Sequence, residues 1–274
     1  MIEVLSNRSI VKVSGQDSLI FLQSLLTNDI KKKSYSYNYF LTNQGRYLCD
    51  LFVYKNTDKE FLLDINAESK TSFMTRLGMY KLRSLVDISD ISNEMCVLYS
   101  KHEISDGAVY SLKDPRYGKL SFRTLVSINK VPTNSKKSDA LYLADKYKYY
   151  IIEGGIDLKY EKSIPIEFGA IELNAIDFDK GCYIGQEVIS RTKYQGEVRK
   201  KIFGLQIIDG TNIALLTKGD EIHSGNGDLL GYICSSHKNA AISLLREEKY
   251  LGLEKKEVII KDSVYKVVVP PWRR

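Results

Sequence analysis

The sequence predicts an α+β fold that ends in a small β-barrel, and three observations predict it. Up to about residue 198, segments patterned as strands and as helices follow one another without the regular alternation of a parallel α/β sheet. From residue 199 onward, short apolar strands alternate with glycine-rich turns such as Gly225-Asn226-Gly227. The length of 274 residues is sufficient for both parts. We therefore expect an α+β core over residues 1–198 and a β-barrel over residues 199–274.

The first hundred residues contain strands, a hairpin and two helices. Residues 9–13 are expected to form a strand, and residues 17–26 a helix, because Leu19, Leu22 and Leu26 fall on one helical face. Strands are expected next at 39–42 and 47–54, joined by a hairpin turn at Asn43-Gln44-Gly45, and then at 61–65, 82–88 and 95–99, with a helix over 67–79.

The middle of the chain is marked by a turn, a linker and a further helix. Asp114-Pro115-Arg116-Tyr117-Gly118 has proline and glycine at positions typical of a turn. Residues 132–138, PTNSKKS, have the composition of a linker, and residues 139–149 are expected to form a helix before Gly154-Gly155. The strongest turn signal of the barrel region is Asn226-Gly227.

Composition excludes several classes of protein. No apolar run approaches the roughly 18 residues of a membrane span. The four cysteines, Cys49, Cys96, Cys182 and Cys234, show no zinc-ligand spacing and are typical of a reduced, cytoplasmic protein. The net charge of +6 and the short lysine runs would suit an anionic ligand or nucleic acid, although solvated lysines are the simpler interpretation.

One segment, residues 177–201, concentrates residues that carry chemistry. Cys182 lies between Gly181 and Gly185, shortly before a helix expected to begin near Gly185, and Lys180 adds positive charge. A helix amino terminus favours a thiolate, and glycines let a backbone approach a ligand closely. This loop would hold a reactive thiol or pack one against a flat ligand. The alternatives are a small buried cysteine in a tight loop, or one cluster ligand at an interface with a partner.

The run Lys180-Gly181-Cys182-Tyr183-Ile184-Gly185-Gln186-Glu187 resembles the K-G-C-[FY]-x-G-Q-E signature of the YgfZ-type folate-binding proteins. That family includes mitochondrial iron–sulfur assembly factors of this type and is related to the aminomethyltransferase (T protein) of the glycine cleavage system. Further resemblance extends along the chain, in Val13-Ser14-Gly15, Leu26-Thr27-Asn28-Asp29, Leu41 to Arg46, Asp114-Pro115-Arg116, Ile164 to Glu167 and Tyr194 to Lys201.

The resemblance implies two α/β lobes, connected near residues 132–138, that form a folate-binding core ahead of the barrel. It implies a tetrahydrofolate-type cofactor, no tightly bound metal, and Cys182 as the working thiol. Asp50 is the second candidate catalytic residue, with an ordinary polar residue on the outer face of a strand as its alternative. The residues expected to contact the cofactor are Lys180, Gly181, Tyr183, Gly185, Gln186, Glu187, Glu153, Asn28 and Arg199.

The sequence departs from the related transferases at two places. Cys49 replaces the first of their two adjacent aspartates, and Ile151 stands where members often have an arginine. A thiol cannot replace a carboxylate beside a cationic aminomethyl group, so classical aminomethyl transfer is disfavoured.

The leading hypothesis is a folate-binding accessory protein for assembly or repair of [4Fe–4S] clusters, with assembly or client proteins as partners and no membrane. The alternatives are a folate-dependent aminomethyltransferase and a tRNA-modification factor acting on RNA. An indirect effect on tRNA is simpler, because enzymes that thiolate tRNA themselves carry such clusters.

Overall fold

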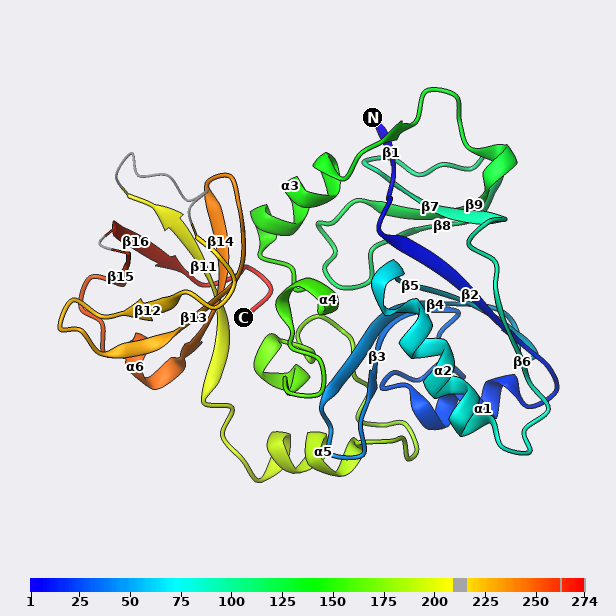
Figure 1. The fold of residues 1–274 in the computed structure, drawn as a ribbon, viewed down its shortest axis with the longest axis horizontal. Helices are drawn as coiled ribbons and strands as arrows, with labels where there is room; N and C mark the ends of the chain where they lie inside the picture. Colours follow the sequence, from blue (N-terminus) through cyan, green and yellow to red (C-terminus); the bar gives the residue numbers. More distant parts are fainter. Residues whose placement is uncertain (209–215, 262, 274) are drawn as a thin grey trace.

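A computed structural model describes residues 1–208, 216–261 and 263–273 of the chain. It contains two five-stranded sheets and a closed six-stranded barrel, which occupies one end of the molecule (Figure 1). The strand orders are β3-β4-β5-β2-β6 in the first sheet, β10-β1-β7-β9-β8 in the second, and β11-β14-β13-β12-β15-β16 in the barrel. The predicted fold class, α+β with a carboxyl-terminal barrel, is confirmed.

The elements have the following bounds. The strands are β1 Ile2–Val4, β2 Arg8–Ser14, β3 Tyr35–Leu41, β4 Tyr47–Thr57, β5 Glu60–Asn66, β6 Asp87–Asp90, β7 Met95–Ser100, β8 Ala108–Lys113, β9 Phe122–Ser127, β10 Lys136–Lys137, β11 Lys200–Ile207, β12 Glu221–His223, β13 Leu229–His237, β14 Ala240–Arg246, β15 Glu257–Ile260 and β16 Ser263–Val268. The α-helices are α1 Ser18–Leu25, α2 Lys70–Lys81, α3 Ala140–Tyr149, α4 Gly154–Asp157, α5 Gln186–Tyr194 and α6 Glu247–Leu251, with short 3₁₀ turns at Ala67–Ser69, Ile128–Lys130 and Pro165–Phe168. None of the helices in the described residues combines the length and apolar character needed to cross a membrane.

The first sheet is buried on both faces, which explains its near-continuous apolar strands. Along β2, Val11 and Val13 pack with α1 and α2 in one core cluster, whereas Ile10 belongs to a second cluster on the other face. Alternate residues of a strand point to opposite faces, so a strand covered on both sides needs apolar residues at nearly every position. The barrel encloses a third cluster of its own.

The hairpin predicted at Asn43-Gln44-Gly45 is confirmed. Strands β3 and β4 pair in antiparallel register, and Gly45 has a positive φ of 67°, a conformation that favours glycine. The strand predicted at 82–88 is wrong over residues 82–86, because only Asp87–Asp90 pairs, as β6, with β2. Leu82 ends α2 with φ 43° and ψ −110°, and this bend prevents an extended start.

The segment predicted to be a linker, residues 132–138, contributes a strand. Lys136 and Lys137 form β10, which pairs in parallel with Glu3 and Val4 of β1. The sequence analysis also missed β1, β8 and β9. The second sheet therefore joins the amino terminus to residues more than a hundred positions later.

Candidate functional site

The loop before α5 is fastened to the end of α1 by Lys180. This side chain is buried, and its Nζ donates hydrogen bonds to the carbonyl oxygens of Gln23 (2.8 Å), Leu26 and Asn28 (3.0 Å). The last carbonyls of a helix have no partner within it and carry the negative end of its dipole. Helix α1 has no basic residue in its own last turn, so Lys180 supplies both the donors and the charge.

The contacts give Lys180 a structural role in addition to the positive charge expected near Cys182. Its three ammonium protons are used on backbone carbonyls, so none is left to donate to the thiol. Burial lowers the pKa of Lys180 to about 8, and nearby aspartates oppose that shift. Lys180 therefore caps the carboxyl end of α1, although it is distant from α1 in the sequence.

On the other side of Cys182, Tyr183 is the second anchor. Its ring is buried in the main core, and the next residue, Ile184, donates its backbone N–H to the carbonyl of Ser24 (3.0 Å). Between the two anchors, Gly181 and Cys182 are exposed. The thiol is therefore at the surface, on a short segment fixed at both ends.

Gly185 adapts the loop to the β3–β4 hairpin. It has a φ of 84° and is followed by α5, as predicted, and a Cβ there would lie 2.6 Å from the carbonyl oxygen of Thr42. Gly181 has open space at its Cβ position. The close approach that glycine allows at Gly185 is therefore to the protein's own backbone. At Gly181 the surrounding space would accept a larger side chain.

Three other predicted contact residues lie apart from a common pocket. Glu187 is exposed and pairs with Arg191 one helical turn later (2.5 Å). Gln186 is half-buried at the first position of α5. Arg199 is exposed and lines a surface hollow of about 700 Å³ between the 3₁₀ turn Pro165–Phe168 and α6. None of the three touches the buried polar network around Glu153.

Asn28 joins the loop to the first sheet. It is buried, and its Nδ2 donates to the carbonyl oxygens of Tyr37 (3.0 Å) and Asn174 (2.7 Å). Its own carbonyl accepts from Lys180. Asn28 therefore connects three segments, and its amide donors are already occupied by backbone.

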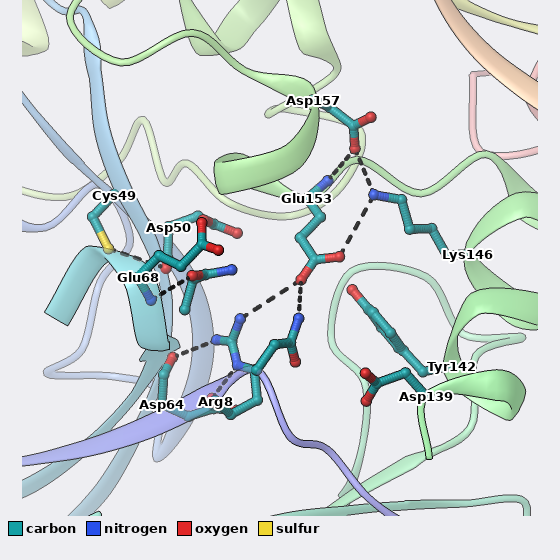
Figure 2. A network of polar contacts seen from close by, with 12 residues as sticks. Arg8, Cys49, Asp50, Asp64, Glu68, Asp139, Tyr142, Lys146, Glu153 and Asp157 are labelled. Carbon is teal, nitrogen blue, oxygen red and sulfur yellow. Dashed lines mark hydrogen bonds and ion pairs between the residues drawn. The ribbon is translucent and has the colours of Figure 1, made fainter. Parts of the chain in front are cut away.

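Glu153, at the start of α4, belongs to a buried network of charged side chains (Figure 2). Its Oε1 accepts from Asn7 Nδ2 (3.3 Å), and its Oε2 lies 3.5 Å from Lys146 Nζ but has no hydrogen-bond partner. Burial raises the pKa of this carboxyl, but Lys146, Arg8 and Arg116 outweigh it and lower the pKa below the usual value. Glu153 is thus an ionised acceptor with one oxygen, Oε2, that is ion-paired with Lys146 but accepts no hydrogen bond.

Asp50 lies beside Glu153. It is 1% exposed, and its two oxygens accept from the hydroxyls of Tyr37 (2.8 Å) and Tyr47 (3.2 Å). A Cβ on Gly154 would lie 2.0 Å from Asp50 Oδ1, so only glycine lets α4 begin there. The alternative interpretation of Asp50, a polar residue on the outer face of a strand, is wrong, because both faces of the sheet are covered.

Three buried charges of this network, Arg8, Asp64 and Arg123, were not found from the sequence, whereas Arg116 was considered as a possible pocket or loop-closing residue. Asp64 accepts from Arg8 Nε and from Arg123 Nη2, both at 2.5 Å, and Arg116 forms a double contact with Asp114. All five side chains are at most 4% exposed. Asp64 and Arg123 could have been found because each is the single charge in the interior of a largely apolar strand. An unpaired charge is costly in a core, so such a residue predicts a buried partner of opposite charge.

The network also reaches the barrel. Lys146 of α3 donates to Asp157 Oδ2 (2.8 Å), which also accepts the backbone N–H of Glu153 (2.8 Å). The other oxygen of Asp157 accepts from Ser235 of β13. The carboxylates near Glu153 are therefore held by elements from the core and from the barrel together.

The remaining cysteines differ from Cys182. Cys49 and Cys234 are buried, and burial raises the pKa of both thiols well above the ordinary value. Cys96 is half-buried. Within the described ranges, all four cysteines are free thiols, and no cluster of three histidine, cysteine or acidic side chains is arranged to hold a metal ion.

Comparison with known proteins gives both sequence and fold relatives. Residues 3–99 match the family described as GCVT N-terminal domain. The human "Iron-sulfur cluster assembly factor IBA57, mitochondrial" is 27% identical over 277 residues, covering 90% of this chain and 78% of the relative. The IBA57 homolog of Mycosarcoma maydis is 30% identical over 222 residues, and the matched part is 73% of this chain but only 55% of that relative.

Among solved structures, the glycine cleavage system aminomethyltransferase T from Bartonella henselae superposes with a TM-score of 0.77. The superposition covers 98% of this chain and 84% of that chain at 14% sequence identity, which establishes the shared fold.

The relatives also correct the expected location. The sequence analysis predicted a cytoplasmic protein, whereas both IBA57 relatives are named as mitochondrial. Scattered reduced cysteines are equally compatible with either compartment, so that argument could not separate them. In sequence the chain is similar to the IBA57 iron–sulfur cluster assembly factors, and in fold it is similar to aminomethyltransferase T.

Proposed function

We propose that this protein supports the assembly or repair of iron–sulfur clusters through the exposed thiol of Cys182. The observation that carries the proposal is the construction of the loop: Lys180 and Tyr183 are buried on either side, and the thiol between them faces solvent. A thiol fixed in this way can meet a partner protein without rearrangement of the fold. The similarity to the IBA57 factors and the YgfZ-type signature support the same role.

We further propose that a tetrahydrofolate-type molecule binds at Glu153. The fit is supported by its buried, ionised Oε2, which accepts no hydrogen bond, together with the Oδ1 of Asn7, which also accepts none. A carboxylate suits the amino and N–H donors of a pterin ring, because it accepts two of them in parallel. Asp50, oriented by two tyrosine hydroxyls, is the second acceptor that we assign to this site.

Bound folate would supply a carrier for one-carbon units, whereas the protein's residues would bind and orient it.

We propose a division between core and barrel at residues 198 and 199, with Asp157 and Ser235 in contact across it. Assembly or client proteins would be the macromolecular partners, and any effect on tRNA would be indirect.

The main test is complementation in cells that lack their own IBA57-type protein, with a [4Fe–4S] enzyme assayed as the readout. Wild type and Cys96→Ala should restore its activity, and Cys182→Ala should not, at equal protein levels. Cys96 is the matched control because it is a second, half-buried free thiol. Equal rescue by Cys182→Ala would reject the thiol role, and no rescue by soluble wild type would reject the function.

The folate site needs a separate binding test. Titration calorimetry with 5-formyltetrahydrofolate should give at least tenfold weaker binding for Glu153→Gln than for wild type, since an acceptor is replaced partly by a donor. Glu187→Gln, an exposed change outside the network, should bind as wild type does. Equal affinity of all three proteins would place the ligand elsewhere.

A further inference from the structure

An exposed apolar patch lies where α1 begins and α2 ends. Four large side chains form it, and each is about two-thirds exposed or more: Ile20 (69%), Met79 (68%), Leu82 (87%) and Leu85 (67%). Isolated exposed apolar residues are ordinary, but a group of them on one surface is typical of a docking site.

Hydrogen bonds hold the two helix ends together at this patch. Asp17, just before α1, accepts the backbone N–H of Leu85 at its Oδ2 (2.7 Å) and donates its own N–H to the carbonyl of Leu85 (3.3 Å). Ile20 is one helical turn beyond Asp17, and Met79 is one turn before Leu82. A hollow of about 750 Å³, lined by Asp17, Leu82 and the residues after it, lies between them.

The conformation of Leu82 argues against an accidental exposure. Its φ of 43° with ψ −110° is a conformation that residues with a Cβ rarely adopt. Leu82 thus combines backbone strain with the largest exposed fraction among the exposed apolar side chains of the described chain. Strained backbone of this kind clusters at binding and switch regions of proteins.

The charge around the patch indicates what covers it. Lys81 and Arg83 flank Leu82, and in the described part of the chain neither side chain has a hydrogen-bond or ion-pair partner. A second copy of this chain would bring like charges together, which is unfavourable. A partner with an apolar centre and acidic rim matches both features.

The patch and the cysteine loop adjoin opposite ends of the same short helix, α1. The patch adjoins the amino end of α1, whereas Lys180, two residues before Cys182, caps its carboxyl end. Eight helical residues span about 12 Å, which one protein domain can cover. We infer that the patch docks an acidic iron–sulfur assembly or client protein and presents Cys182 to it. This inference rests on the proposed function for the partner's identity.

Two variants separate docking from folding. Leu82→Gly removes the apolar side chain and suits the positive φ, so its Tm should be equal to or above that of wild type, while rescue of the [4Fe–4S] enzyme at low expression falls at least threefold. Leu251→Ser is the matched control, since Leu251 is a similarly exposed leucine (65%) on the barrel side. Full rescue by Leu82→Gly would overturn the inference.

Photo-crosslinking identifies what covers the patch. A crosslinking amino acid at position 85, but not at 251, should capture in cells an iron–sulfur protein through an acidic peptide, and the double change Lys81→Glu with Arg83→Glu should abolish the product. Crosslinks only to a second copy, products equal to those from position 251, or patch-dependent sedimentation of the purified protein with phosphatidylserine vesicles would overturn it. Failure of wild type to complement would reject the proposed function alone, because the crosslink does not depend on rescue.

Discussion

Replacement of Lys180 by methionine tests whether the cysteine loop is held by a buried ammonium group. Methionine has nearly the same length and is apolar, so it fills the space but donates no hydrogen bond. Three carbonyls at the end of α1 then lose their donor. At about 1 kcal/mol for each, we expect Lys180→Met to lower the free energy of unfolding by about 3 kcal/mol at pH 7.5.

The difference between wild type and Lys180→Met should also grow with pH. Burial lowers the pKa of Lys180 from 10.5 to about 8, so between these values the unfolded chain binds more protons than the folded one. Stability therefore rises with pH across this window and is lowest where the buried group is fully charged. From pH 7.5 to 9.5 the wild type should gain about 2 kcal/mol relative to the variant, at about 1.4 kcal/mol for each pH unit above the folded pKa.

Urea unfolding of both proteins at the two pH values measures this directly, and subtraction of the variant removes the contribution of all other titrating groups. A difference that stays constant with pH would show that Lys180 titrates in the folded state as it does in the unfolded state. A difference that falls with pH would show that the three carbonyls raise the pKa more than burial lowers it. Either result would refute the reasoning from burial.

Three further outcomes are expected from the same structure. Gly185→Ala should lower the free energy of unfolding by about 2 kcal/mol or more in urea melts, because of its positive φ and the 2.6 Å approach to backbone, whereas Gly181→Ala should change it by less than about 0.5 kcal/mol. In the native protein a maleimide should modify Cys182 within minutes and leave Cys234 unmodified until urea is added, as judged by mass spectrometry; equal rates would contradict the burial difference. Arg123→Met should cost about 3–5 kcal/mol, because it removes one of the two arginines that pair with a fully buried aspartate; a cost below about 1 kcal/mol would mean that the remaining arginine suffices.

The parts of the fold that could be predicted are those determined by local pattern. Short runs rich in apolar residues predicted β2, β4 and β5, and Asn43-Gln44-Gly45 predicted the turn between β3 and β4. Leu22 and its neighbours predicted α1. Each of these signals lies within about ten residues of the chain. Strand β10 could not be found in this way, because two lysines become a strand only beside β1.

The candidate site was predictable only in part, for the same reason. The residues of the Lys180–Glu187 run were recognised, but their roles depend on contacts made across the fold. Lys180 reaches a carbonyl 154 positions away, and Asp64 and Arg123 meet from strands of different sheets. No pattern within either segment identifies its partner. Sequence reasoning therefore found residues of the loop but not the distant parts of the chain that Lys180 and Gly185 contact.

These contacts explain why the loop needs so many specified residues to expose one thiol. An exposed segment would ordinarily move freely, and a mobile thiol would meet a partner at a variable position. Lys180 fixes the segment to α1, Gly185 fixes it to the hairpin, and Tyr183 fixes it to the core. The freedom left is confined to Gly181 and Cys182. Loss of any anchor should therefore reduce the function of Cys182 even when the thiol is intact, which distinguishes a positioned thiol from one that needs only to be accessible.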